Sequence, residues 1–275
     1  MNFIVLGHTG FIGAPLYARL IGQGYKVLGL NSSQISMNSQ QEFRLKPRTN
    51  LSIFEEIKEF ISEETIIINC IWGDLSHEKN NSNSHELYRA LEFDLICCLH
   101  ALNFKLYVSF GTIHEVHTSV SVLSGISKYV ESKKQIREHL ESSNIPFSWI
   151  RIASVFGPND SKFRIIPQLL VDSIHNVDTQ LLYPNQQMNI YHIEDFIDSL
   201  VVFISSPSTG SYLATSSMWV ELIEIKNAIR RLEEPNYSLA PLLSIENNSS
   251  QVISVESSSF IHFVKDFIAD NSLTR

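Results

Sequence analysis

Gly7-His8-Thr9-Gly10-Phe11-Ile12-Gly13, near the start of a chain of 275 residues, is the segment most informative about the fold. It follows an apolar run at residues 2–6 and precedes residues 11–21, where apolar residues recur at helical spacing until Gly22 and Gly24. Glycines between a strand and a helix let the backbone approach a pyrophosphate closely, and the helix N-terminus supplies N–H donors. The G-x-x-G-x-x-G spacing therefore predicts a dinucleotide-binding loop, with a purely structural turn as the alternative.

Strand-like and helix-like segments alternate along more than half of the chain. The expected strands are residues 2–6, 25–30, 65–71, 105–110 and 146–154, and the expected helices are residues 11–21, 51–61, 85–103 and 127–142. Such alternation is typical of an α/β protein with a Rossmann-like, doubly wound parallel sheet. After Gly157-Pro158 the pattern loosens, with a helix at 165–174, a strand and helix over 190–204, and helices at 219–232 and 259–269.

This change of pattern predicts two lobes. We assign residues 1–157 and about 189–205 to an NAD(P)-binding domain. A smaller, partly interleaved substrate lobe takes residues 158–188 and 206–275.

Composition narrows the choice of partners and compartment. The net charge is -8 and no dense Lys/Arg run occurs, so nucleic acid and anionic membranes are not expected partners. The first residues have no basic segment before the apolar run, which argues against a signal peptide and favours a cytoplasmic protein. Cys70 and the adjacent Cys97-Cys98 have neither disulfide nor zinc spacing, and we expect no metal site.

The cofactor side of the prediction covers the loop and the ends of two later strands. The second expected strand runs into Asn31-Ser32-Ser33, which lacks both an acid for a ribose 2′-hydroxyl and an arginine for a 2′-phosphate. We therefore expect NADP or NAD, with a slight preference for NADP. The expected cofactor-binding residues are Gly7, Thr9, Gly10, Phe11, Ile12, Gly13, Asn31, Ser32, Ser33, Cys70 and Lys133.

A second motif is Tyr129-Val130-Glu131-Ser132-Lys133, within the helix expected at 127–142. An ammonium four residues from a phenol lies on the same helix face and lowers the pKa of the tyrosine from about 10, which suits it for acid-base chemistry. Upstream, the strand at 105–110 runs into Gly111-Thr112, so a hydroxyl stands at the carboxyl end of a strand, where open α/β sheets bind ligands. A half-buried ring beside a solvated lysine is the structural alternative.

The order of these features resembles the short-chain dehydrogenase/reductase superfamily, in its extended branch of nucleotide-sugar epimerases, dehydratases and reductases. The resemblance implies that Thr112 polarises the substrate oxygen, that Tyr129 exchanges the proton, and that Lys133 binds the nicotinamide ribose while lowering the tyrosine pKa. The segments Arg151 to Pro158 and Tyr191-His192-Ile193-Glu194-Asp195 resemble later elements of the same branch. A homodimer through the long helix and the Tyr129 helix, and a role in polysaccharide biosynthesis, are further implications.

A second alignment of the catalytic motif stays open. Ser124-Gly125-Ile126-Ser127-Lys128 resembles the family segment Tyr-Gly-x-Ser-Lys with its tyrosine lost, which would make the chain a cofactor-binding protein without catalysis. The interval from Lys133 to Arg151 favours Tyr129, because it resembles that of shorter family members.

The remaining residues bear on the substrate. Asp94 stands where many members have an active-site Asn, and Met188 where epimerases carry an arginine for the diphosphate. The expected substrate-binding residues are Asp94, Ser154, Lys162 and Arg164, the last two as substitutes for that arginine. Thr112 is followed by Ile113-His114 rather than the Asp-Glu pair of dehydratases. We therefore expect a reductase of a nucleotide-linked 4-keto-6-deoxy sugar, with a nucleotide-sugar epimerase as the alternative.

Overall fold

The computed structural model describes residues 1–30, 57–58, 60–73, 82–116, 120–217 and 219–232. The chain divides into two compact units. Unit 1 holds Met1–Ile152 and Leu200–Leu213, and unit 2 holds Ala153–Ser199 and Ala214–Arg275. The sequence-based division placed residues 153–157 and 189–199 with the first domain and residues 206–213 with the second, whereas these units group the first two ranges with unit 2 and the last with unit 1.

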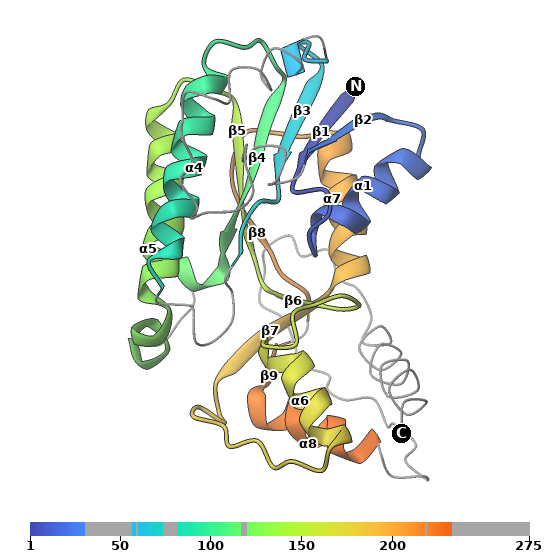
Figure 1. Ribbon diagram of the computed structural model, residues 1–275, viewed down its shortest axis with the longest axis vertical. Helices are drawn as coiled ribbons and strands as arrows, with labels where there is room; N and C mark the ends of the chain where they lie inside the picture. The colour runs from blue at the N-terminus through green and yellow to red at the C-terminus, as the bar shows by residue number, and fades with distance from the viewer. Residues whose placement is uncertain (31–56, 59, 74–81, 117–119, 218, 233–275) are drawn as a thin grey trace, which may run out of the picture. The chain divides into compact units, whose positions relative to one another are not determined.

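Unit 1 is built on a six-stranded sheet with the order β2-β1-β3-β4-β5-β8 (Figure 1). The pairings of β1 with β2 and β3, of β3 with β4, and of β4 with β5 are all parallel. The chain steps outward from β1 to β2 and then returns to the other side of β1 with β3, which is the topological switch of a doubly wound sheet. The strands are β1 (Asn2–Leu6), β2 (Lys26–Leu30), β3 (Thr65–Asn69), β4 (Leu106–Thr112), β5 (Phe147–Ile152) and β8 (Gly210–Ala214).

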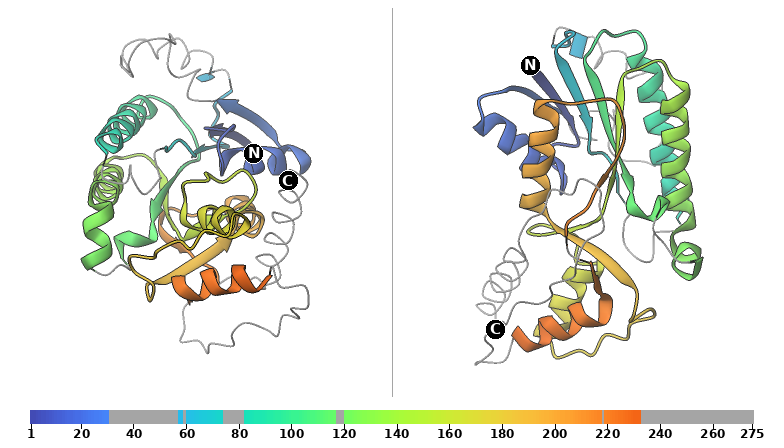
Figure 2. Two further views of the ribbon diagram at one scale, coloured as in Figure 1. Left: turned by 60° about the horizontal axis from the view of Figure 1, so that its bottom comes forward. Right: turned by 180° about the vertical axis from the view of Figure 1, so that it is seen from behind.

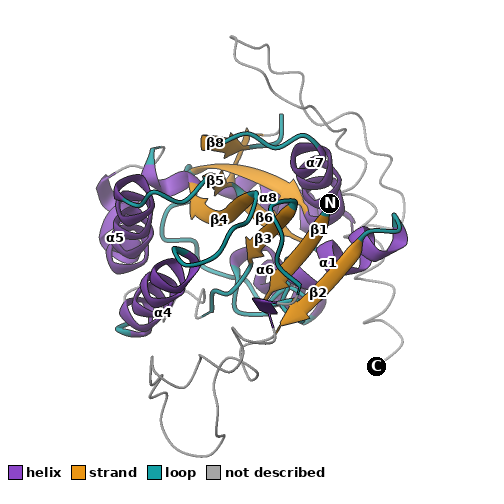
Figure 3. Ribbon diagram, turned by 90° about the horizontal axis from the view of Figure 1, so that it is seen from above, coloured by secondary structure: helices purple, strands orange, loops and turns teal. Residues whose placement is uncertain are grey.

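The central strands are apolar on both faces because helices cover both. All residues of β3 and β4 are buried, which is the pattern of parallel strands between helical layers. Helices α4 (Ser84–Leu99) and α5 (Val120–Ser142) lie on one face of the sheet (Figure 3). Helix α1 (Gly13–Gly22) and the part of α7 (Ile193–Ser205) that belongs to unit 1 lie on the other. The predicted fold class is thereby confirmed.

Unit 2 has its own small sheet and core. Strand β7 (Gln187–His192) pairs in parallel with β6 (Ser154–Phe156) and antiparallel with β9 (Trp219–Glu221). Helices α6 (Ile165–Ile174), yellow in Figure 2, and α8 (Leu222–Leu232), orange there, belong to the same unit. Their buried faces meet the strands in one apolar cluster made of Phe156, Ile166, Leu169, Leu170, Ile190, Val220, Leu222, Ile225 and Ile229.

Several boundaries differ from the sequence-based expectation. The strand expected at 146–154 is broken at Ala153, whose N–H donates to the carbonyl of Ala214 instead of continuing the β5 ladder. Residues Trp219–Glu221 were expected to be helical and instead form β9, because pairing with β7 overrides their local pattern. Strand β8 and the short 3-10 helix η3 (Ile113–Glu115) were not expected at all. The helices expected at 51–61 and 259–269 lie wholly or mostly outside the described residues.

Candidate active site

The glycine loop joins β1 to α1 in a turn that only glycine allows. Gly7 has φ +77, a left-handed conformation, and its carbonyl accepts a hydrogen bond of 2.9 Å from the N–H of Gly10. A Cβ on Gly13 would lie 2.1 Å from the Gly7 carbonyl oxygen, so a side chain there would collide with backbone. At Gly10, by contrast, the nearest atom to such a Cβ is the same oxygen at 3.2 Å, and the residue is exposed. The loop therefore packs tightly on its inner side and is accessible at Gly10.

The N-terminus of α1 is suited to an anion. Its N-cap residue is Ile12, no side chain caps the helix, and its first turn contains no acidic residue. The helix dipole and backbone N–H groups of such an end attract negative charge, and here no carboxylate of the helix competes. A pyrophosphate fits this arrangement, with Thr9 and Gly10 exposed beside it. The residues that would hold the adenosine ribose, Asn31, Ser32 and Ser33, lie outside the described residues.

Cys70 connects the glycine loop with the catalytic candidates. A Cβ on Gly7 would lie 3.1 Å from the Cys70 carbonyl carbon, so the backbone after β3 lies directly against the loop. Burial raises the pKa of the Cys70 thiol to about 12, and the positive charge of Lys133 acts against that shift. Cys70 is therefore a neutral thiol at physiological pH, and its backbone is the part that borders the loop.

Tyr129 and Lys133 lie on α5 and both contact the same indole. The ring centroid of Tyr129 is 5.9 Å from that of Trp72, and Lys133 Nζ lies 3.6 Å from the Trp72 ring centroid. Lys133 is only 4% exposed. The pair predicted from the i, i+4 spacing thus lies on one face of α5, with Lys133 buried and Tyr129 half-buried, and both side chains contact a residue that follows β3.

Lys133 has the electrostatic environment of a functional lysine. Burial lowers the pKa of its ammonium from 10.5 to about 8, because the charged form loses its water. The negative charges of Glu92 and Glu115 act in the opposite direction. Lys133 makes no ion pair with any residue that the structure describes. A buried, unpaired cation with a perturbed pKa is typical of functional sites.

The competing motif has a different environment. Lys128 is exposed, and its Nζ donates a hydrogen bond of 2.5 Å to Asn83 Oδ1. Ile126, in the middle of that motif, has φ -130 and ψ 15, which breaks the helical geometry of α5 at this point. Burial and helix geometry therefore favour Lys133 over Lys128 as the catalytic lysine.

Thr112 ends β4 and is held inside a capping box. Its hydroxyl oxygen accepts a hydrogen bond of 3.3 Å from the N–H of His114, and its own N–H donates to Glu115 Oε1 at 3.0 Å. Burial lowers the pKa of the neighbouring His114 to about 4, so that ring is neutral at physiological pH. The hydroxyl of Thr112 keeps its proton for donation to a further acceptor.

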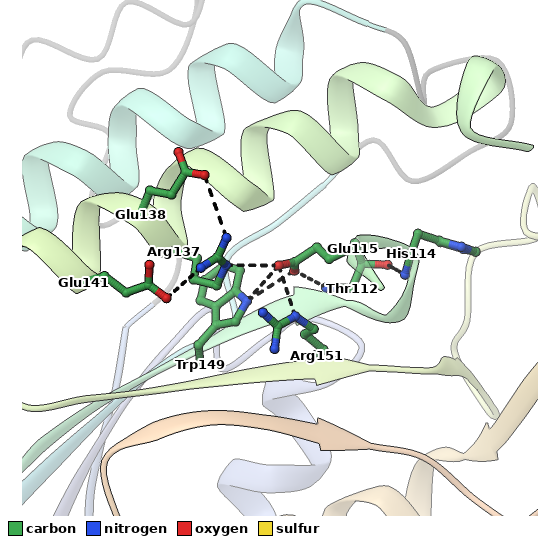
Figure 4. A network of polar contacts seen from close by, with 8 residues as sticks. All are labelled: Thr112, His114, Glu115, Arg137, Glu138, Glu141, Trp149 and Arg151. Carbon is green, nitrogen blue, oxygen red and sulfur yellow. Dashed lines mark hydrogen bonds and ion pairs between the residues drawn. The ribbon is translucent and has the colours of Figure 1, made fainter. Parts of the chain in front are cut away.

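Glu115 is the centre of a polar network that the sequence reasoning missed (Figure 4). Its side chain is 2% exposed. The carboxylate accepts hydrogen bonds from Trp149 Nε1 at 3.2 and 3.3 Å and from Arg151 Nε at 3.2 Å, and forms an ion pair with Arg137 Nε at 3.5 Å. It thereby ties the end of β4 to β5 and to α5. A signal was present in the sequence, because Thr112-Ile113-His114-Glu115 matches the S/T-x-x-E capping pattern.

On α4 the buried acid is Glu92, two residues before the expected Asp94. Glu92 accepts hydrogen bonds from the hydroxyl of Tyr107, at 2.9 Å, and from that of Ser109. Tyr107 also accepts a hydrogen bond of 3.0 Å from Asn69 Nδ2. Asp94 is half-buried, and its charge helps to raise the pKa of the Cys98 thiol after burial, the larger cause. The structure therefore associates Glu92, not Asp94, with Lys133.

The substrate candidates of unit 2 are less constrained. Ser154 is half-buried in β6, and Lys162 is exposed, with Nζ 5.3 Å from the Phe163 ring centroid. Arg164 forms an ion pair of 2.9 Å with the buried Asp160. Burial raises the pKa of that carboxyl, while Arg164 acts to lower it. Arg164 thus already neutralises a buried charge of its own chain.

Two negative observations concern membranes and metals. None of the helices in the described part of the chain is both long and apolar enough to cross a membrane. Within the same residues, no three His, Cys, Asp or Glu side chains group as a metal site.

A parallel α/β sheet whose first strand runs through a glycine loop into a helix defines the dinucleotide-binding class of fold. Residues 3–213 match the model of the NAD dependent epimerase/dehydratase family, and the chain belongs to this family. The resemblance stated from the sequence is thereby confirmed, and NAD is the cofactor that defines the family.

Among the relatives, a CDP-abequose synthase of Yersinia pseudotuberculosis is 23% identical, over 77% of this chain and 76% of its own length. A CDP-abequose synthase of Salmonella muenchen is 21% identical, over 86% of this chain and 81% of its own length. A UDP-glucose 4-epimerase from Thermotoga maritima, solved with UDP-glucose, has a similar fold, with a TM-score of 0.68 at 13% identity, covering 100% of this chain and 99% of its own. WbmH of Bordetella bronchiseptica, solved with NAD+, gives 0.68 at 15% identity, with 98% and 97% covered.

Proposed function

We propose that the protein is an NAD(P)-dependent oxidoreductase that reduces a nucleotide-linked 4-keto-6-deoxy sugar, with Tyr129 as the acid/base. The observation that carries this proposal is the pair formed by the half-buried Tyr129 and the buried Lys133, which both contact Trp72. Burying the Lys133 ammonium costs free energy of folding, and its pKa is lowered accordingly. A buried cation of this kind beside a phenol on the same helix face is typical of a functional site.

Each residue has a distinct role in the proposal. The nicotinamide cofactor, when bound, supplies hydride exchange, and the loop Gly7 to Gly13 would hold its pyrophosphate. Tyr129 would donate a proton to the sugar oxygen, while the charge of Lys133 lowers the pKa of the phenol. Lys133 would also hold the nicotinamide ribose, and the hydroxyl of Thr112 would donate a hydrogen bond to the same sugar oxygen.

Support for the substrate class comes from the relatives, and it indicates a class of sugar rather than one particular sugar. The two CDP-abequose synthases carry a CDP-linked sugar in their names, and they match most of this chain. We therefore propose a nucleoside diphosphate sugar as substrate, with a CDP-linked sugar as the first to be tested. Asp94 of unit 1, and Ser154, Lys162 and Arg164 of unit 2, remain proposed substrate contacts.

The decisive experiment follows the cofactor. Purified protein is mixed with NADH or NADPH and a CDP-linked 4-keto-6-deoxyhexose, and loss of reduced cofactor is recorded by absorbance. Tyr129→Phe should lower turnover by about 10²–10⁴, because the acid is lost, while cofactor binding measured by fluorescence stays the same. Tyr25→Phe, which removes a phenol next to Phe3 and away from Lys133, is the matched control and should keep full turnover.

The other outcomes identify the alternatives. An epimerase would convert the sugar, detected by NMR, without net loss of reduced cofactor. A protein that binds cofactor but shows no turnover with any nucleotide-sugar, and in which Tyr129→Phe changes nothing, would refute the catalytic proposal. The preference for NADP is tested in the same assay by comparing kcat/KM for the two cofactors.

The proposed assembly is a homodimer through α4 and α5, which the family resemblance implies. Sedimentation equilibrium of the purified protein measures it directly. A monomer at the concentration of the activity assay would rule the homodimer out without affecting the proposed chemistry.

A further inference from the structure

Trp72 is the centre of an aromatic cluster that the proposed reaction does not yet use. It follows β3 by three residues and contacts two rings of α4 and one of α5. The centroid of its ring is 5.9 Å from that of His85, nearly parallel at 10°, and 5.3 Å from that of Tyr88. Tyr129 meets it edge-on at 5.9 Å and 61°. The indole is therefore packed between the two helices that carry the proposed chemistry.

The face of this indole holds the Lys133 ammonium. Nζ lies 3.6 Å from the ring centroid, well within the distance at which a cation is attracted by the π electrons of tryptophan. The indole of Trp149 is farther away, at 5.9 Å. A buried ammonium without an ion pair must recover stabilisation from other groups, and the Trp72 face is the group in closest aromatic contact.

We infer that Trp72 is a positioning residue for the proposed Tyr129–Lys133 pair: its face binds the ammonium of Lys133, and its ring also packs against the ring of Tyr129 in a T-shaped arrangement. This inference rests on the proposed function for its catalytic meaning, since it assigns the residue that keeps the two groups together. Both contacts involve the same rigid ring, so Trp72 adds to α5 a second constraint on where the phenol and the ammonium lie.

The backbone before Trp72 is anchored to the sheet, which fixes where the indole can lie. The N–H of Cys70 donates to the carbonyl of Leu6 at 2.9 Å, and the N–H of Ile71 donates to Asn69 Oδ1 at 3.0 Å. The amide of Asn69 in turn donates to the hydroxyl of Tyr107, which donates to Glu92. The backbone just before Trp72 is thus connected through hydrogen bonds to Glu92, a buried acid whose charge acts on Lys133.

The other charged and titratable groups near Lys133 lie on α4, on η3, on α5 itself and on the segment that follows β3. Glu92 lies on α4, Glu115 in η3 and Cys70 after β3, and each of them raises the pKa of Lys133 when it is ionised. Tyr129 shares α5, and His85 of α4 contacts both Trp72 and Tyr129. Cys70 is a neutral thiol at physiological pH, so Glu92 and Glu115 supply the negative charge and Trp72 supplies direct contact.

The test compares two substitutions that are both apolar and differ in the π face. Trp72→Phe keeps an aromatic face. Trp72→Leu places an aliphatic side chain there whose size is close to that of phenylalanine. The pKa of Lys133 is read from ¹³C-ε-lysine NMR, with its signal assigned by its loss in Lys133→Arg. We expect the Lys133 pKa to be about 0.5–1 unit lower in the Leu variant than in the Phe variant. Trp219→Leu, at an exposed tryptophan of unit 2, is the control and should not change it.

The activity assay provides the second readout. The alkaline limb of the pH profile of kcat/KM should move to lower pH in Trp72→Leu relative to Trp72→Phe, by about the same amount as the Lys133 pKa. A purely structural tryptophan would lower kcat/KM without moving that limb. Equal Lys133 pKa values in the two variants would overturn the inference.

Two further outcomes keep the test decisive. If Tyr129→Phe retains turnover, the proposed function fails, but the NMR titration still decides whether Trp72 holds Lys133. If Trp72→Leu does not fold, by its circular dichroism spectrum, Trp72→Met takes its place, because the flexible methionine side chain fills irregular apolar space.

Discussion

Lys133 and Arg137 are one helical turn apart on α5, and they differ in the groups that surround their charges: carboxylates at Arg137 and an aromatic ring at Lys133. Arg137 contacts the carboxylates of Glu115, Glu138 and Glu141. Lys133 lies on the face of Trp72 and makes no ion pair with a described residue. Both side chains are removed from bulk water to a large extent, so their difference lies in the groups that surround them.

The comparison distinguishes a buried carboxylate that is paired with cations, Glu115, from a buried ammonium that is not paired with an anion of the described residues, Lys133. At Glu115 two guanidinium groups and an indole N–H surround one carboxylate, which satisfies the charges and fixes the ends of β4 and β5 on α5. At Lys133 the charge remains uncompensated at contact distance, and the pKa of the ammonium falls to about 8. The first arrangement gains local rigidity, and the second keeps a proton that can be exchanged near neutral pH.

The largest effect on stability is expected at Glu115. Glu115→Ala removes the acceptor of Trp149 Nε1, Arg151 Nε and the N–H of Thr112, and leaves two cations without their shared partner. Breaking such a buried network should cost about 3–5 kcal/mol in the free energy of unfolding, measured in urea. Glu115→Gln, which keeps an acceptor oxygen, should cost less. A loss below about 1 kcal/mol in the alanine variant would contradict the structural role.

Lys133→Met should raise the free energy of unfolding, whereas Glu115→Ala should lower it. The pKa of Lys133 is 10.5 in the unfolded chain and about 8 in the folded protein, so the folded state is penalised at every pH below 8. The penalty declines between pH 8 and 10.5 and is absent above. We expect the variant to be more stable by about 2 kcal/mol at pH 7, with the gain vanishing near pH 10.5, while turnover is lost.

The measurement for Lys133→Met is urea unfolding at both pH values. Arg137→Met is the matched comparison on the same helix and should destabilise the protein, because it leaves Glu115 with one cation fewer. If both methionine variants changed stability in the same direction, the distinction between the two cations would not hold.

Glu92→Gln tests whether the negative charge of Glu92 raises the pKa of the Lys133 ammonium without direct contact. The amide keeps an oxygen that accepts the hydrogen bond of Tyr107 but removes the negative charge, so the pKa of Lys133 should fall about 0.5–1 unit further. The ¹³C-ε-lysine NMR titration measures this shift. Glu131→Gln, at an exposed position of α5, should leave the Lys133 pKa unchanged. An unchanged value in Glu92→Gln as well would show that Glu92 only binds hydroxyls.

The smallest effect is expected at the solvent side of the Arg137 cluster. Glu141 forms an i, i+4 ion pair with Arg137 at 2.6 Å and is exposed. Glu141→Gln should cost about 0.3–0.5 kcal/mol at low salt, and less at high salt, because exposed pairs are screened. Unfolding in urea at two ionic strengths checks this value. A loss comparable with that of Glu115→Ala would mean that the outer pairs, rather than the buried carboxylate, hold the network together.

The local features of the site could be predicted from the sequence because they depend on neighbours in the chain. The position of Gly7, Gly10 and Gly13 between an apolar run and a helical pattern indicated the loop, and the structure gives Gly7 the left-handed backbone that such a turn requires. The spacing of Tyr129 and Lys133 placed both on one face of a helix. The pattern around Trp219 misled, because its β9 pairing partner is a distant segment.

The environment of these residues could not be read from the pattern. Glu92 and Asp94 are two residues apart on one helix, and only the packing of α4 on the sheet decides that Glu92 faces Tyr107 and Ser109. The sequence left Lys128 as an alternative to Lys133, with only the interval to Arg151 favouring Lys133, and the structure shows that Lys128 is exposed and Lys133 buried. Their difference arises from the kink at Ile126 and from which face of α5 meets the sheet.

The class of fold, the glycine loop and the spacing of the catalytic candidates follow from local sequence, since apolar periodicity and glycine conformation act within a few residues of the chain. The contact of the Lys133 ammonium with Trp72, and the contacts of Glu115 with Arg137, Arg151 and Trp149, exist only in the folded chain. These contacts join segments up to 61 residues apart, between Trp72 and Lys133 (133 − 72). Desolvation and charge pairing depend on which distant side chains share a buried volume, and no local pattern contains that information.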